Sequence, residues 1–381
     1  MFSWMHYDEY EVRSMRLMSN VLLEYVRCGL FRLRSLALAT VVFSAMLPAA
    51  SALAQAPGID RWSQLSAANN LDNEGSTPFH LKMTFQLYDL AGKPAETGTV
   101  EEWWASPKSR RIIISSPSLN EDGFSPHNSS PSVVRESYLV NQLIDAAVHP
   151  VPRVAPMNGD QTDERIREFG KVPLNCLTRK PNSSGAPTMN GSVLCMQPKT
   201  DDLRIILSSD GNEAMTRDST GKFGDTYAAL ELQIRLVGRV AITGKVTMLQ
   251  SFDPAKSEVE LHSPAEAPAA SGPISATPLS GAVLAGKRVK FVQPMYPLAA
   301  KEERISGSVL LRVIITKEGT VRDLVPIASS NPIFTEAAED SVRKWKYSPY
   351  LLNGEPTEVG SIITVNFAIN GGSIPGSWGP Q

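Results

Sequence analysis

The stretch GSVLLRVIIT, residues 307–316, decides the fold of the C-terminal part of the chain. Val309, Leu311 and Val313 alternate with residues that face the other way, which is the two-residue period of a β-strand with one buried face. The next residues, KEG at 317–319, have the composition of a tight turn, and TVRDLVPIA at 320–328 follows as a second strand, with Pro326 near an edge or a bulge. The stretch therefore predicts a β-hairpin.

A helix and a final strand follow the hairpin. Asn331 and Pro332 suit the cap and the first position of a helix. Apolar and small residues then recur with helical spacing up to Trp345, and this spacing predicts one buried helix face. The segment SIITVNFAI, 361–369, again alternates, with Ile363 and Val365 on one face. We expect one helix packed on a small antiparallel sheet.

Five motifs in this region occur together in one order. They are QPMYP at 293–297, ISGSV at 305–309, KEGTV at 317–321, AEDSVRKWKYSP at 338–349 and FAING at 367–371. In this combination residues 287–372 resemble the TonB C-terminal domain of the bacterial cell envelope. Within that resemblance we interpret Tyr296 and Trp345 as core residues.

The resemblance implies a mode of binding. Family members capture a short extended segment of an outer-membrane receptor beside their last strand, which is strand addition to a sheet edge. The partner-binding residues carried over to this chain are Gln293 in the entry segment and Ser361, Ile362, Thr364 and Asn366 on the last strand. The alternative is that the linker or a second copy of the chain, as a homodimer, covers this edge.

The energy transducers of the family keep an uncleaved anchor helix with a functional histidine and couple to a motor in the inner membrane. Residues 36–56 contain no histidine here, and a whole domain takes the place of the long proline-rich spacer. The departure puts energy coupling in doubt, so an accessory role in the envelope and the role of a membrane-anchored transducer both stay open.

Residues 57–262 are predicted to form an exported domain rich in antiparallel strands. Alternating segments begin at FHLKMTFQLY, 79–88, and helical stretches are expected at Tyr138–Ala147 and Asp163–Phe169, which makes the whole chain α+β. The strand order and GTVEEWWASPKSRR, 98–111, resemble the half-barrel lipoprotein carriers of the LolA type. That resemblance implies an apolar cavity for a lipid, and the alternative is a sheet with a filled core.

The ends of this domain differ in composition from the rest. Residues 1–54 are interpreted as a leader with a signal peptide, cleaved near Ala54 to give a periplasmic protein. The alternative is an uncleaved inner-membrane anchor at residues 35–56. Residues 263–286, rich in Pro, Ala, Ser and Gly, are predicted to be a linker to a C-terminal domain at 287–381.

Two of the three cysteines follow the leader. An even pair in an exported chain favours a disulfide between Cys176 and Cys195, closing a loop rich in Pro, Gly, Asn and Ser. The alternative is a metal pair, which the absence of histidine nearby disfavours.

The remaining chemistry is sparse. The formal net charge is −2, which gives no strong field for nucleic acid. Histidines lack metal-ligand spacing, and the adjacent carboxylates Glu101 and Glu102 are interpreted as solvated surface on opposite faces of a strand. We therefore expect a non-catalytic protein without metal or cofactor. It would bind a TonB-dependent outer-membrane receptor or another envelope protein in transport across the envelope. The alternative is a periplasmic carrier of a lipid or other apolar ligand.

Overall fold

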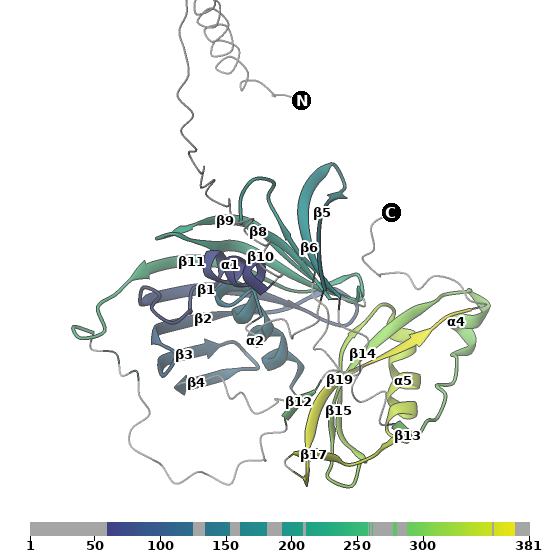
Figure 1. Ribbon diagram of the computed structural model, residues 1–381. Helices are drawn as coiled ribbons and strands as arrows, with labels where there is room; N and C mark the ends of the chain where they lie inside the picture. Colours follow the sequence, from purple (N-terminus) through teal and green to yellow (C-terminus); the bar gives the residue numbers. More distant parts are fainter. Residues whose placement is uncertain are drawn as a thin grey trace, which may run out of the picture. The chain divides into compact units, whose positions relative to one another are not determined.

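The computed structural model describes residues 59–124, 134–152, 161–180, 193–208, 211–257, 259, 261, 277–279, 288–352 and 354–369. Residues 57–262 contribute two helices, α1 (Ile59–Asn69) and α2 (Arg135–Val148), and a large set of strands (Figure 1). The strands are β1 (Phe79–Tyr88), β2 (Pro94–Ser106), β3 (Ser109–Ser115), β4 (Asn120–Phe124), β5 (Gln161–Phe169), β6 (Val172–Lys180), β7 (Val193–Met196), β8 (Leu203–Leu207), β9 (Glu213–Phe223), β10 (Thr226–Leu236) and β11 (Arg239–Ser251).

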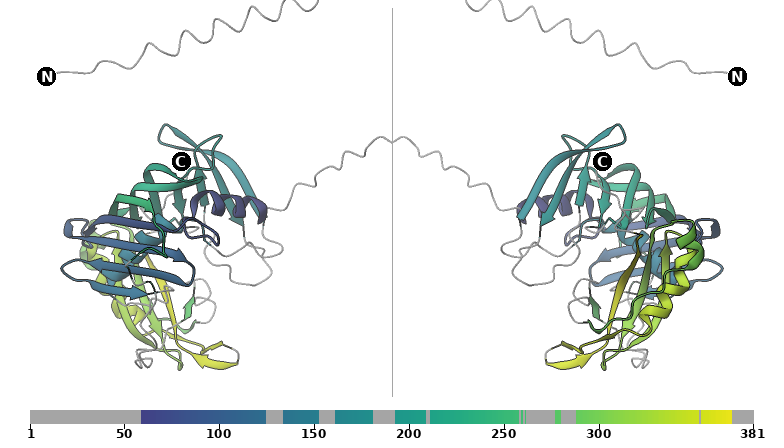
Figure 2. Two further views of the ribbon diagram at one scale, coloured as in Figure 1. Left: turned by 90° about the vertical axis from the view of Figure 1, so that its left-hand side faces the viewer. Right: turned by 90° about the vertical axis from the view of Figure 1, so that its right-hand side faces the viewer.

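These strands form one antiparallel sheet in the order β4-β3-β2-β1-β11-β10-β9-β8-β7-β6-β5. Figure 2 shows the strands in two further views. Apolar and polar residues alternate along the strands, so one face of the sheet is buried. In β1, Leu81, Met83 and Phe85 are buried and the residues between them are more exposed. Trp104 is buried on the same principle, while Trp103 stacks on the ring of His80 at 4.6 Å. The prediction of a β-rich α+β domain is confirmed.

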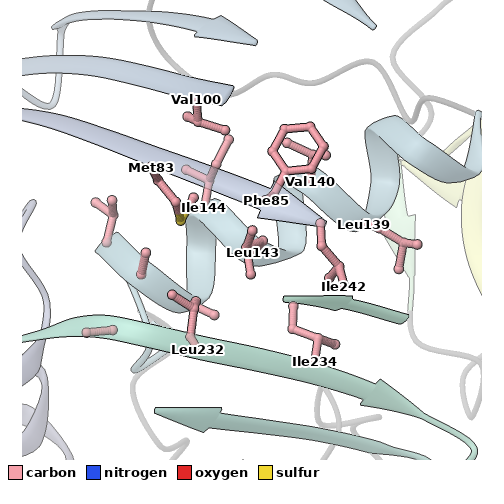
Figure 3. Packing of buried hydrophobic residues seen from close by; sticks show 14 of the residues in the cluster. Met83, Phe85, Val100, Leu139, Val140, Leu143, Ile144, Leu232, Ile234 and Ile242 are labelled. Atoms are coloured by element: carbon pink, nitrogen blue, oxygen red, sulfur yellow. The ribbon is translucent and has the colours of Figure 1, made fainter. Parts of the chain in front are cut away.

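Helix α2 covers the apolar face of the central strands. Leu139, Val140, Leu143 and Ile144 are fully buried there. Figure 3 shows them facing apolar side chains of β1, β2, β10 and β11. At Gly244 on β11 a Cβ would lie 2.9 Å from Leu143, so glycine lets the helix approach the sheet closely. Side chains of α2 therefore pack closely on this face of the central strands.

The prediction of a helix at Asp163–Phe169 is wrong, because these residues lie in strand β5. Gly170, with a φ of 65°, closes a tight turn, and β6 returns alongside β5 over its whole length. Glu and Arg residues favoured a helix locally, but pairing with a strand already in the sheet outweighs that weak preference. The charged side chains of β5 suit its place at the edge of the sheet.

The interpretation of Glu102 as solvated surface is also wrong. Its side chain is fully buried, and Arg110 Nε lies 2.9 Å from Glu102 Oε1. Removal from water raises the pKa of Glu102 to about 7, against the lowering effect of Arg110. Glu101, on the other face, is partly exposed and contacts His80 Nε2 at 2.7 Å and Lys82 Nζ at 2.8 Å. Glu101 and Glu102 lie on opposite faces of β2, as predicted, but the face that carries Glu102 is buried in the core.

Residues 277–369 add the small strands and helices of the C-terminal region. They are β12 (Thr277–Leu279), β13 (Arg288–Lys290), α4 (Leu298–Glu302), β14 (Gly307–Ile315), β15 (Val321–Ser329), the 3-10 turn η1 (Pro332–Phe334), α5 (Thr335–Val342), β16 (Lys346–Tyr347), β17 (Tyr350–Leu352), β18 (Glu355–Thr357) and β19 (Val359–Phe367). One four-stranded sheet has the order β12-β19-β14-β15. The predicted small sheet with one helix on it is confirmed, and β12 is an addition to it.

The C-terminal core has the predicted composition. Asn331 Oδ1 accepts from the backbone N–H of Ile333 at 3.1 Å, which caps the helical segment as expected. Phe334, Ala338 and Val342 are fully buried against β14 and β19. The turn at 317–319 places Gly319 at a φ of 79°, where a Cβ would lie 1.9 Å from Tyr347 O, so only glycine fits without rearrangement.

The second face of β14 is also buried. Leu310 lies in the same apolar cluster as Tyr138 of α2, and the Arg312 guanidinium lies 5.3 Å from the Tyr138 ring centre. Arg135 donates to the backbone oxygens of Tyr88 at 2.7 Å and Ile327 at 2.9 Å. These contacts explain why β14 is apolar in almost every position and not only on alternate residues.

Candidate functional site at the edge of the last strand

Strand β19 has one fully paired side and one partly paired side. Strand β14 pairs with it antiparallel along its whole length, from Val359 to Phe367. On the other side β12 pairs with it in parallel, and this pairing covers only Val359–Ser361. From residue 362 to 367, no strand within the described ranges pairs with this second side. The backbone there presents N–H and C=O groups that an added strand can use.

The side chains of β19 alternate as predicted. Ile363, Val365 and Phe367 are buried in the C-terminal core. Ile362 and Thr364 are half-buried and Asn366 is exposed on the opposite face.

The five predicted binding residues are not equivalent. Ser361 is only 3% exposed, and Ile362 packs against the cluster that contains α2. Asn366 accepts a hydrogen bond from Ser308 Oγ at 2.8 Å, which ties the exposed end of β19 to β14. Thr364 and Asn366 are therefore the residues of this set whose side chains are best placed to meet a partner.

Gln293 lies in a separate entry segment whose backbone is anchored on helix α5. The Val292 carbonyl accepts from Ser341 Oγ at 2.6 Å and from Trp345 Nε1 at 2.8 Å. The Gln293 side chain is exposed, and among the described residues no hydrogen bond or ion pair joins it to β19. The entry segment reaches the last strand through Tyr296, whose ring lies 5.8 Å from that of Phe367. Tyr296 and Trp345 thus pack in the core, as predicted.

One charged network holds the start of the last strand. Glu358 immediately precedes β19 and is mostly buried, and its Oε1 lies 2.7 Å from Arg322 Nη1 of β15. Arg322 also contacts Asp323 at 2.8 Å. The hydrogen bond that Arg322 donates to Asp323, followed by the attraction of both carboxylates, raises the pKa of Arg322. The guanidinium stays charged and spans the sheet face from β15 to the start of β19.

The predicted disulfide is present between Cys176 and Cys195, which face each other on the adjacent strands β6 and β7. Both sulfurs are fully buried. The bond joins the two ends of a hairpin whose tip lies outside the described residues. It joins two outer strands of the large sheet, whereas the candidate site lies on the small sheet.

The remaining sequence predictions concern the leader, a membrane anchor and metal binding. The leader at 1–54, its cleavage near Ala54 and the alternative anchor at 35–56 lie outside the described residues. Within the described part of the chain, no helix has the length and apolar character needed to cross a membrane. The described side chains also include no cluster of three or more His, Cys, Asp or Glu suited to a metal ion.

The sequence did not indicate strand β12. Thr277–Leu279 is embedded in a segment with the composition of a linker and contains a proline, and so it carries no alternating pattern. The sequence also did not indicate the contact between Glu102 and Arg110. A charged residue normally marks an exposed face, so Glu102 was not expected in the core.

Comparison with known proteins bears on this region. Residues 292–369 match the family model for the C-terminal region of the Gram-negative bacterial TonB protein. Protein TonB of Escherichia coli (strain K12) is 36% identical over 81 residues, which are 21% of this chain and 31% of that protein. The chain thus spans about a third of the length of the curated relatives it matches.

Two solved structures are similar to different parts of the chain. The solution structure of the Pseudomonas aeruginosa TonB C-terminal domain shares 23% identity, covering 23% of this chain and 89% of that one with a TM-score of 0.21. A LolA superfamily protein from Nitrosomonas europaea shares 7% identity, covering 50% of this chain and 94% of that one with a TM-score of 0.32.

Proposed function

We propose that this chain is a non-catalytic protein of the bacterial cell envelope that binds an extended segment of a partner by strand addition along residues 362–367 of β19. The partner class is a TonB-dependent outer-membrane receptor or another envelope protein. The observation that carries the proposal is an edge of β19 at residues 362–367 with which no strand of the described ranges pairs, in the region, residues 292–369, that matches the TonB C-terminal family model.

The edge has the chemistry that strand addition needs. An incoming strand gains main-chain hydrogen bonds from β19, and these do not depend on the partner's side chains. Specificity then comes from the side chains that flank it. Thr364 and Asn366 offer a hydroxyl and an amide on one face. Gln293 is proposed as a second contact from the entry segment.

The proposed location is the periplasm, after cleavage of a leader near Ala54. The alternative location is the inner membrane, with an anchor at residues 35–56. In either location the binding edge faces the same compartment as the segments of outer-membrane receptors that TonB proteins bind. The disulfide between Cys176 and Cys195 supports an oxidising compartment of this kind.

The carrier alternative needs an apolar cavity in the N-terminal domain. Helix α2 places four fully buried side chains on the apolar face of the sheet, those of Leu139, Val140, Leu143 and Ile144. The packed cluster there includes residues of β1, β2, β10 and β11. A lipid chain would have to displace these side chains. Strand addition needs no such rearrangement, and we therefore favour it over lipid carriage.

Photocrosslinking in living cells tests the proposal. A photoreactive amino acid is placed at Thr364 or Asn366 and, as controls, at the exposed Lys317 in the turn between β14 and β15 and at Lys245 on the large sheet. We expect crosslinks to an outer-membrane receptor from the two β19 positions only. A crosslink between two copies of the chain would identify a homodimer at this edge instead. Equal crosslinking from the control positions would contradict the proposed edge.

A further inference from the structure

The unpaired part of β19 begins where a segment of the chain's own linker ends. Thr277 pairs with Val359, Pro278 with Gly360 and Leu279 with Ser361, in parallel orientation (Figure 1). The same side of β19 is where the proposed partner strand would add. One side of a strand can hold only one neighbouring strand in a sheet. The linker segment and a partner strand that reaches residues 359–361 therefore exclude each other.

We infer that Thr277–Leu279 is a built-in occupant of the partner-binding edge, which a partner strand displaces. The inference rests on the proposed function, because it concerns regulation of the same edge. In this arrangement the protein has a closed state, with β12 on β19, and an open state, with residues 359–367 all free to pair. A partner that needs the full edge binds only the open state, and its apparent affinity is reduced by the closed fraction.

The segment has the properties of a weak occupant. It is only three residues long. Pro278 has no backbone N–H, so the segment can donate hydrogen bonds from Thr277 and Leu279 alone. Proline in a strand is found at sheet edges, where no further strand follows. A longer partner strand without proline makes more hydrogen bonds and replaces it.

Tethering compensates for this weakness. Residue 279 is followed after eight residues by Arg288, which β13 holds against β16 of the same domain. Eight intervening residues are few enough to keep the segment beside β19 at an effective concentration on the order of millimolar. Two hydrogen bonds under this condition shift an equilibrium by roughly 5- to 150-fold. The closed and open states are thus both populated. Weakly binding partners then fail to displace β12, whereas stronger partners succeed.

A matched pair of variants tests the occupant directly. Thr277→Pro with Leu279→Pro removes both N–H groups that the segment can donate. Ala267→Pro with Ala269→Pro makes the same change around Pro268, elsewhere in the linker. Amide hydrogen exchange of residues 359–361 is measured on the full mature chain. We expect exchange at the N–H groups that face β12 to speed up about 5- to 150-fold in the first variant, and exchange to stay at the wild-type rate in the second.

A synthetic peptide of sequence SATPLSG, residues 275–281, provides the binding probe. At millimolar concentration we expect it to shift the NMR signals of residues 359–361 in the Thr277→Pro, Leu279→Pro variant and much less in wild type. A second variant, Leu279→Cys with Ser361→Cys, is designed to lock β12 onto β19. It should resist the peptide until a reductant is added, and Leu279→Cys alone serves as its control.

The outcomes separate this inference from the proposed function. The inference that Thr277–Leu279 occupies the edge is overturned by either of two results. One is unchanged exchange in the Thr277→Pro, Leu279→Pro variant, and the other is equal peptide shifts in wild type and variant. If exchange and peptide binding behave as expected while no variant crosslinks to a receptor from Thr364, the occupant stands and the proposed partner class is wrong.

Discussion

Replacing Trp345 by alanine should detach the entry segment that carries Gln293 from the C-terminal core. The indole is 5% exposed and donates from Nε1 to Val292 O at 2.8 Å and contacts Ser341 Oγ at 3.1 Å. Its ring also lies 5.1 Å from that of Phe291. Truncating a buried tryptophan leaves a cavity and costs about 3–5 kcal/mol, and we expect a loss of unfolding free energy in this range.

Trp345→Phe separates packing from hydrogen bonding. Phenylalanine keeps most of the buried ring and loses the N–H. Val292 O keeps its second donor, Ser341 Oγ at 2.6 Å, so no buried carbonyl is left unpaired. The expected cost is therefore only about 1 kcal/mol.

Hydrogen exchange in increasing urea, read from peptides of residues 288–369, measures both losses. Peptides of residues 79–115 serve as the internal control, since their core does not include Trp345. A loss below about 1 kcal/mol for alanine, or equal losses for alanine and phenylalanine, would refute the assigned role.

Three further predictions concern stability. Burial raises the pKa of Glu102 from 4.5 to about 7, so between these pH values the folded protein binds a proton that the unfolded chain has released. The stability that this proton contributes, on the order of 3 kcal/mol, is complete below pH 4.5 and is lost as pH rises through 7. Glu102→Gln should flatten this part of a stability–pH curve. Gly319→Ala should cost at least ~2 kcal/mol in urea melts, because of its positive φ and the contact with Tyr347 O, whereas Gly92→Ala, at a φ of 81° and with its Cβ 3.7 Å from the nearest side-chain atom, should cost less. Replacing both disulfide cysteines by alanine should lower stability by about 3 kcal/mol, and alkylation of the reduced wild type should require urea, because both sulfurs are buried.

The C-terminal region was predictable because local and tertiary preferences agree there. Its turn needs glycine, its helix has a side-chain cap, and its strands alternate, so each short segment indicates the same structure that the core requires. The last strand was placed two residues late, a usual error at a strand end.

The N-terminal region was less predictable because long-range pairing decides its strands. Strand β5 has helix-forming residues and exists because β6 lies beside it. Glu102 places a carboxyl group in the core, and the pairing of β2 with β3 brings Arg110 beside it. No local sequence pattern indicates that β6 pairs with β5 or that Arg110 lies beside Glu102.

At the candidate site, the sequence predicted a final strand whose alternate side chains face away from the core, and the structure has this strand; that the strand binds a partner stays a prediction. The sequence did not indicate that Ile362 packs against the α2 cluster or that Thr277–Leu279 pairs with the same edge. Both facts arise from segments far away in the chain. The contacts of β19 therefore had to come from the structure.

Amide hydrogen exchange along β19, with and without a purified outer-membrane receptor, tests strand addition most directly. Successive N–H groups of a strand point to opposite sides, and one set already pairs with β14. Added pairing should therefore slow exchange at every second residue from Ile362 to Phe367, while β15 remains unchanged. Slowing at all of these residues alike, at β15, or only on the large sheet would contradict strand addition at this edge.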